Sequence, residues 1–172
     1  MRAGSRLPPR LLGCLLLAAC LGGCLGAPPA PVQGEDGAPC PKNWRPFRGY
    51  CYGFFQELLT WAEAEEECER YGSMGHLASI HSEGASNVLA AYLENQGHAT
   101  GSVWIGLHDE EHSRQWKWSD SSAVDYTRWG PGQPSKMWAR EDCVVLQDRS
   151  GFMLWYDYDC NRKFSFLCQH QP

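Results

Sequence analysis

Hydrophobic and polar positions follow two different periods in two parts of the chain. Between residues 60 and 97, apolar positions recur every three or four residues, a spacing typical of amphipathic helices. From residue 103 onward, short apolar or aromatic runs are separated by polar turns, which is typical of strands. Helices followed by strands, without alternation of the two, predict an α+β fold in which two helices pack on an antiparallel sheet.

The first helix is predicted to begin at Thr60. Thr60 and Glu63 have the spacing of a capping box, in which each side chain accepts a hydrogen bond from the backbone N–H of the other residue. Gly72 is the expected terminator. The face expected to point toward the core carries Trp61, Ala64, Cys68 and Tyr71.

A second helix is predicted over residues 83–96, with Gly97 as its terminator. Its expected core face carries Ala85, Val88, Leu89, Tyr92 and Leu93. Short strands are expected at residues 49–55, 76–80, 103–107, 115–118, 143–146, 154–156 and 164–168. Most of the segment 120–142 is expected to be loop, and loops of this length in a compact domain are usually functional or poorly ordered.

The first 26 residues have the pattern of a secretory signal peptide. A basic start is followed by an apolar run at residues 11–21, and small residues then lead to an expected cleavage after Gly26. The apolar run is too short to span a bilayer. Residues 27–39 are expected to be a flexible lead-in, and residues 40–172 to form one domain. We therefore expect a secreted protein without a membrane anchor.

Cysteine usage indicates the same compartment. The chain has nine cysteines, and cleavage after Gly26 removes three of them. An even set in a secreted domain indicates a disulfide framework. The same parity argues against a lipid anchor, although residues 17–20 resemble a bacterial lipobox. The remaining cysteines are Cys40, Cys51, Cys68, Cys143, Cys160 and Cys168.

The charge balance excludes one class of partner. The formal charge is −5 for the whole chain, and it becomes −8 once the three arginines of the leader are removed, because 12 basic residues then face 20 acidic ones. An acidic domain repels the phosphates of nucleic acids and of anionic membranes. We therefore expect no nucleic-acid partner, while cations, neutral glycans and mineral surfaces remain open.

Candidate chemistry lies around the stretch from residue 133 to residue 160. This region carries an amide, a hydroxyl and carboxylates, whose oxygens are suitable ligands for a hard cation, together with tryptophans that offer flat faces to a sugar. The set suits a cation, a sugar or both, and equally a site that has lost its ligand. Its members are Gln133, Ser135, Trp138, Glu141, Asp157 and, just upstream, Trp129.

Several motifs at consistent spacing resemble those of C-type lectin-like domains. They are Trp-Ile-Gly-Leu at 104–107, Cys68 in the first helix, Leu-Ala-Ser-Ile at 77–80, Glu-Asp-Cys at 141–143, Cys160 and Phe-Leu-Cys at 166–168. The resemblance covers residues 40–172, and it is closest to the secreted regenerating (lithostathine-like) group, its fourth subgroup in particular, and to eggshell matrix lectins. It implies the long form of the domain, with the disulfides Cys40–Cys51, Cys68–Cys168 and Cys143–Cys160.

The resemblance also implies a calcium site that is only partly kept. Sugar-binding members hold calcium with a Gln-Pro-Asp or Glu-Pro-Asn triplet, a downstream glutamate and an Asn-Asp pair. Here Gln133 takes the first position of the triplet, and Ser135, a weaker ligand, takes the third. Glu141 and Asp157 keep the carboxylates, whereas Tyr156 replaces the asparagine. Gln133, Glu141 and Asp157 would thus form a degraded site that binds calcium weakly, at about 10⁻⁴–10⁻³ M, or not at all.

Binding of a glycan or polysaccharide is the function that the resemblance implies. The regenerating group is associated with calcium-independent binding of polysaccharides, and Trp129 and Trp138 lie in polar surroundings where a stacking face is expected. The expected sugar-binding residues are Gln133, Ser135, Trp138, Glu141, Asp157 and Trp129. The tryptophans expected in the core or the sheet are Trp104, Trp116, Trp118 and Trp155.

Two other functions compete with the lectin. An acidic, mineral-associated structural protein is favoured by the glutamates that crowd the first helix, and a zinc peptidase by the spacing of His108, Glu111 and His112. The peptidase motif requires a helix, however, and here it lies between two predicted strands, where a charged hairpin turn is expected. We therefore expect no enzyme. The glutamates are Glu63, Glu65, Glu66, Glu67 and Glu69.

Overall fold

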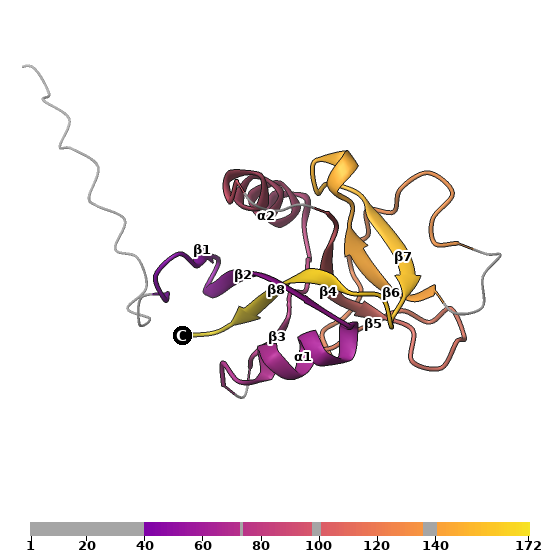
Figure 1. Ribbon diagram of the computed structural model, residues 1–172, viewed down its shortest axis with the longest axis horizontal. Helices are drawn as coiled ribbons and strands as arrows, with labels where there is room; N and C mark the ends of the chain where they lie inside the picture. The colour runs from indigo at the N-terminus through magenta and orange to yellow at the C-terminus, as the bar shows by residue number, and fades with distance from the viewer. Residues whose placement is uncertain (1–39, 73, 98–100, 136–140) are drawn as a thin grey trace, which may run out of the picture. The chain divides into compact units, whose positions relative to one another are not determined.

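The computed structural model describes residues 40–72, 74–97, 101–135 and 141–172 (Figure 1). The expected signal peptide and lead-in therefore lie outside the described residues. Within the described ranges, no helix is both long enough and apolar enough to cross a membrane. The elements are β1 (Arg45–Phe47), β2 (Tyr50–Leu59), α1 (Trp61–Glu69), β3 (His76–Leu77), α2 (Glu83–Asn95), β4 (Val103–His108), β5 (Lys117–Trp118), β6 (Glu141–Leu146), the 3₁₀ turn η1 (Asp148–Ser150), β7 (Trp155–Asp159) and β8 (Phe164–His170).

The strands form one sheet in the order β1-β2-β8-β4-β6-β7, with β3 paired to β8 and β5 to β4. All pairs are antiparallel except β4 with β8, where Val103 lies opposite Ser165 and Trp104 opposite Phe166 in parallel register. The α+β class is confirmed, but the expectation of a purely antiparallel sheet is wrong at this pair. Short apolar strands carry no signal for their neighbours, and β4 and β8 are far apart in the sequence.

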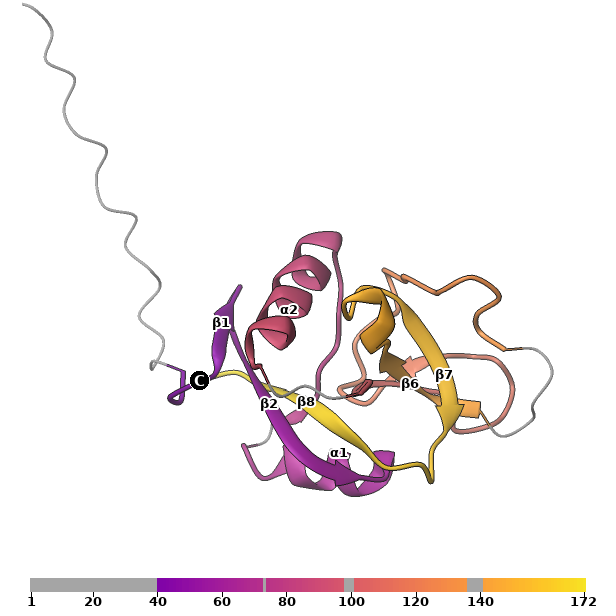
Figure 2. The same cartoon turned by 45° about the horizontal axis from the view of Figure 1, so that its top comes forward.

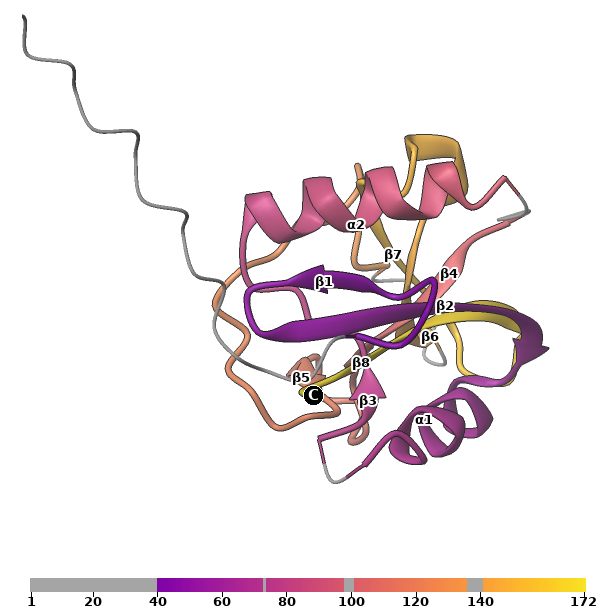
Figure 3. The same ribbon diagram turned by 90° about the vertical axis from the view of Figure 1, so that its left-hand side faces the viewer.

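Both predicted helices are present, and they lie on opposite sides of β2 and β8 (Figures 1 and 3). The capping box of α1 is confirmed, because Thr60 Oγ1 accepts from the N–H of Glu63 and Glu63 Oε2 accepts from the N–H of Thr60 at 2.9 Å. The helix ends at Glu69, earlier than the expected stop at Gly72. In α2 the buried face is shifted toward Ala85, Ser86, Leu89, Ala90 and Leu93.

The Trp-Ile-Gly-Leu segment forms the centre of the core. Trp104 and Ile105 are fully buried, and Trp104 Nε1–H donates to Leu59 O at 3.0 Å. Gly106 lets the chain around β3 approach β4, because a Cβ at this position would lie 2.8 Å from Leu77 O. Of the tryptophans expected in the core or the sheet, Trp104, Trp118 and Trp155 are buried. Trp116 is half-buried and packs against the core from one side.

The described cysteines form the three implied disulfides, Cys40–Cys51, Cys68–Cys168 and Cys143–Cys160. Cys68–Cys168 ties α1 to β8 across 100 residues, and closing a loop of that length stabilises the fold by roughly 4–5 kcal/mol in the chain-entropy view. Cys143–Cys160 joins β6 to the end of β7. The Cys143–Cys160 disulfide therefore holds the two strands that carry Glu141 and Asp157 next to each other.

Asp120 anchors the start of the long loop to the sheet. Its carboxylate accepts hydrogen bonds from Ser79 Oγ at 2.6 Å, from Gln169 Nε2 at 2.8 Å and from the N–H of Ser122 at 2.9 Å. Burial acts to raise the pKa of Asp120, but hydrogen bonds from Ser122, Ser79 and Gln169 together outweigh it, so the pKa lies below its ordinary value. The folded state therefore favours the charged carboxylate.

This pKa makes the fold sensitive to acid. A carboxyl group whose pKa is lowered by folding contributes stability above its unfolded pKa, and that contribution is lost as pH falls through the folded pKa. We expect the free energy of unfolding, measured by chemical denaturation, to decrease below about pH 4, and Asp120→Asn to flatten this decrease. At neutral pH the variant should lose about 1–3 kcal/mol, because an amide cannot accept from all of these donors.

The exposed Glu110→Gln is the matched control and should keep the acid slope of the wild type. An unchanged slope in Asp120→Asn would show that Asp120 does not carry this pH dependence.

Candidate functional site

Residues of the predicted site converge where the end of the long loop meets β7. The N–H of Ser135 donates to both carboxylate oxygens of Asp157, at 2.9 Å each, and the N–H of Asp157 donates to Gln133 Oε1 at 3.1 Å. Glu141 opens β6, which runs beside β7 (Figure 2). The structure thus brings Gln133, Ser135 and Asp157 together, with Glu141 on the neighbouring strand. Trp138 lies outside the described residues.

Asp157 is the buried centre of this group, because its side chain has no exposed surface. Burial raises the pKa of Asp157 above its ordinary value, and the Ser135 N–H and the Arg114 guanidinium oppose that shift without overcoming it. Arg114 Nη1 lies 3.3 Å from Asp157 Oδ2. The carboxylate therefore has a cationic partner within the protein.

Arg114 is the residue that the sequence analysis missed. Besides Asp157, its guanidinium donates to two backbone carbonyl oxygens, from Nη2 to Ser135 O and from Nη1 to Glu141 O at 3.4 Å. One side chain thereby joins the loop, β6 and β7. No motif pointed to it, because the predicted charged hairpin turn covered residues 108–112, and nothing in that pattern shows where the chain goes at Arg114.

The turn that presents Arg114 is held by two buried aspartates. Asp109 accepts from the N–H groups of Ser113 at 3.1 Å and of Arg114 at 2.6 Å. His112 Nδ1 lies 2.6 Å from Asp142 Oδ2. His112 and Arg114 have φ angles of 53° and 63°, a left-handed conformation that is unfavourable for residues with a Cβ. The hydrogen bonds to the aspartates offset this strain and fix the direction of the Arg114 side chain.

The same geometry tests whether calcium fits. Calcium requires six to eight oxygen ligands at about 2.3–2.6 Å. Here both oxygens of Asp157 and the amide oxygen of Gln133 accept N–H groups, and a guanidinium lies against Asp157. The Tyr156 ring packs so closely on Gly130 that a Cβ there would overlap it, which agrees with the loss of a ligand at position 156. In this arrangement the donor set does not fit a calcium ion.

The aromatic side of the site is a row of packed tryptophans. Trp129 is half-buried, with its ring centroid 5.0 Å from that of Trp116 and 6.0 Å from that of Trp155. The Arg114 Cζ atom lies 6.0 Å from the Trp116 ring centroid. Trp129 therefore contacts neighbouring tryptophans on two sides, and Trp116 connects this row to Arg114.

The peptidase spacing does not produce a metal site. The described chain has no helix at residues 108–112, as the turn prediction required. His108 ends β4 and packs its ring 4.5 Å from that of Trp61, whereas His112 contacts Asp142. The two imidazoles thus have separate structural partners.

The acidic face of α1 is partly neutralised within the protein. Glu63 caps the helix, Glu67 pairs with Arg70 at 2.7 Å, and Glu65 contacts both His76 Nδ1 at 2.6 Å and the N–H of Leu77. The side-chain atoms of Glu65, Glu69 and His76 that could ligate a metal ion lie within 4.8 Å of one another. Part of the acidic charge on this face is therefore directed to solvent, because Glu63, Glu66 and Glu69 are exposed.

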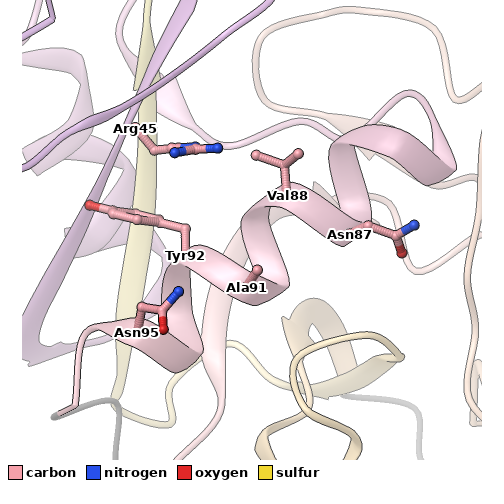
Figure 4. A pocket seen from close by; sticks show the side chains of 6 residues that line it. All are labelled: Arg45, Asn87, Val88, Ala91, Tyr92 and Asn95. Atoms are coloured by element: carbon pink, nitrogen blue, oxygen red, sulfur yellow. The ribbon is translucent and has the colours of Figure 1, made fainter.

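A separate pocket of about 390 Å³ lies between α2 and β1 (Figure 4). Val88 and Tyr92, which were predicted to face the core, both line this pocket and are only half-buried, and Tyr92 also packs against the core. The Tyr92 hydroxyl donates to Asn43 O at 2.8 Å and accepts from the N–H of Phe54, so it holds β2 to the segment before β1. None of the predicted site residues that the structure describes lines this pocket. The lining residues are Arg45, Asn87, Val88, Ala91, Tyr92 and Asn95.

Comparison with known proteins agrees with the motifs in the sequence. Residues 57–170 match the family model of the lectin C-type domain. The C-type lectin BJcuL of Bothrops jararacussu is 41% identical over 138 residues, which span 80% of this chain and 87% of BJcuL. Human lithostathine has 36% identity and a TM-score of 0.74, covering 77% of this chain and 100% of its own.

Ovocleidin-17, a major protein of the calcified layer of the Gallus gallus eggshell, has 33% identity and a TM-score of 0.67, covering 78% of this chain and 100% of its own. The resemblances to the regenerating group and to eggshell proteins are thereby confirmed.

Asp109 gives a direct test of how the site is built. Asp109→Ala would leave two N–H groups without their acceptor, and a buried donor left unpaired costs about 1–3 kcal/mol. We expect chemical denaturation to show a loss of at least about 1 kcal/mol. Glu110→Ala, at the exposed neighbouring position, should stay within about 0.5 kcal/mol of the wild type. Equal stability of the two variants would mean that Asp109 does not hold the turn.

Proposed function

The chain belongs to the C-type lectin domain family, and from this premise we propose that it is a secreted carbohydrate-binding lectin whose binding does not require calcium. Relatives in this family are binding proteins without enzymatic activity, and the chain is likewise not an enzyme. Secretion is supported by the leader pattern of residues 1–26 and by the disulfides, because disulfides persist in oxidising compartments.

One observation carries the proposed calcium independence, namely the contact of the Arg114 guanidinium with Asp157. In a calcium-dependent site this carboxylate would be a metal ligand. Here the Arg114 guanidinium and one backbone N–H, that of Ser135, contact the carboxylate from within the protein. The negative charge of Asp157 is thus already balanced within the protein, and no metal ion is required to balance it.

The glycan is proposed to lie on the surface formed by the end of the long loop and the start of β6. Gln133 and Ser135 are half-buried there, Glu141 contributes a carboxylate, and the Arg114 side chain is 36% exposed. Such groups exchange hydrogen bonds with sugar hydroxyls, and charged partners make the stronger ones. The acidic charge of the domain favours a neutral glycan or polysaccharide over a sulfated one.

Association with a mineral surface is a second candidate, favoured by the likeness to ovocleidin-17. The exposed Glu66 and Glu69 on α1 offer carboxylates for such a surface. The internal partners of Glu65 and Glu67 reduce the charge that remains for it.

Glycan binding with and without a chelator separates these functions. We expect the purified protein to bind neutral polysaccharides equally on an array in calcium buffer and in EDTA. Glu141→Gln should weaken binding by tenfold or more, since a hydrogen bond to a charged group contributes about 1.5–3 kcal/mol. Glu110→Gln is the matched control. Loss of binding in EDTA would contradict calcium independence. Binding to calcite but to no glycan would contradict the lectin.

A further inference from the structure

Arg114 is the unexpected member of the site, and its contacts suggest what it replaces. We propose that the Arg114 guanidinium is the resident cation of this site, taking the position of a metal ion against Asp157 and joining the loop to β6 and β7. This inference rests on the proposed function, because the Arg114 contact supplies the physical reason why glycan binding does not require calcium.

The three contacts of the guanidinium resemble those of a bound metal ion in kind. Its acceptors are all oxygens, namely Ser135 O, Glu141 O and Asp157 Oδ2, and they come from three separate segments of the chain. A metal ion in such a place would also draw oxygens from separate segments around one positive centre. A guanidinium does this with several N–H donors in a fixed planar arrangement.

Burial of Asp157 makes a cation necessary. The Asp157 side chain is fully shielded from solvent, and a buried carboxylate without a partner is strongly unfavourable. Arg114 supplies the charge from a side chain that is itself 36% exposed, so only one member of the pair is fully desolvated. Because the guanidinium stays protonated at any ordinary pH, it needs no loading step, unlike a metal ion.

The backbone around Arg114 directs the guanidinium toward Asp157. Arg114 has a left-handed φ of 63°, and strained residues of this kind persist where the surroundings hold them. Asp109 provides the hold by accepting from the N–H of Arg114 at 2.6 Å. The direction of the side chain is therefore built into the turn, rather than arising from a flexible surface arginine that meets a carboxylate by chance.

A guanidinium in this position excludes a divalent ion, because like charges a few ångströms apart repel strongly in a partly buried site. The converse also follows. Without the guanidinium, the Asp157 carboxylate and the carbonyl oxygens of Ser135 and Glu141 would be left without a cation. They supply four oxygens, so a calcium ion there would take the rest of its six to eight ligands from water and would displace the Ser135 N–H from Asp157. Removal of Arg114 should thus create a cation site that the natural protein does not have.

Terbium luminescence on the intact, disulfide-bonded protein tests this, with calcium as the competitor. Trp116 lies beside Arg114 and can sensitise a bound terbium ion. Glu69→Gln is included in every protein to remove the other group of converging ligands, on α1 and β3. In this background we expect no saturable signal with Arg114 present. Arg114→Ala should bind calcium with a Kd of about 10⁻⁴–10⁻³ M, as in weak extracellular sites.

Two further variants define the site. Asp157→Asn added to Arg114→Ala should weaken cation binding by tenfold or more, because it removes the buried ligand. Arg114→Lys keeps a positive charge and should bind no cation. The inference is overturned if Arg114→Ala folds but binds no calcium or terbium, or if the protein with Arg114 binds calcium as tightly as the variant does.

If Arg114→Ala does not fold without an added cation, its refolding yield is compared with and without calcium to test whether calcium can replace the guanidinium. Recovery in calcium supports the replacement of one cation by another. Failure in calcium, together with failure of Arg114→Lys, overturns it. No glycan enters these assays, so a protein that binds no sugar would contradict the proposed function without affecting the cation result.

Discussion

A carboxylate fully removed from water requires a positive charge or hydrogen-bond donors close to it, and Asp157 has the Arg114 guanidinium and the N–H of Ser135. This constraint shapes the surrounding chain. The Ser135 N–H turns the end of the long loop toward β7, and Arg114 brings the turn before β5 onto the same carboxylate. The contacts with the buried Asp157 carboxylate therefore position the loop and the turn. The exposed groups on these segments take their places as a consequence.

The rest of the domain gives Asp157 a fixed position. Cys143–Cys160 joins the strands on which Glu141 and Asp157 lie, and Asp120 holds the other end of the long loop to Ser79 and Gln169. The loop is thus anchored at both of its described ends. The proposed calcium independence requires such anchoring, since no ion would then gather these groups when a glycan binds. A disulfide, hydrogen bonds and an ion pair give the site rigidity from within the protein.

Local features of the fold could be predicted from the sequence, whereas long-range ones could not. The capping box of Thr60 depends on residues close in the chain, and the core position of Trp104 was predicted from the apolar run that contains it; both are confirmed. The disulfide pairing followed only from the family resemblance. The parallel β4–β8 pair and the role of Arg114 depend on how distant segments meet, and hydrophobic periodicity does not record that. For the same reason Val88 was expected on the core face of α2 but is half-buried and lines a pocket.

The central claim is that the positive charge at Asp157 belongs to Arg114, with or without calcium. A high-resolution crystal structure of the wild-type protein grown in calcium tests it most directly. We expect density for the Arg114 guanidinium against Asp157 and Ser135, with the contacts described above. A calcium ion at about 2.3–2.6 Å from the Asp157 oxygens, with Arg114 turned toward solvent, would contradict the claim.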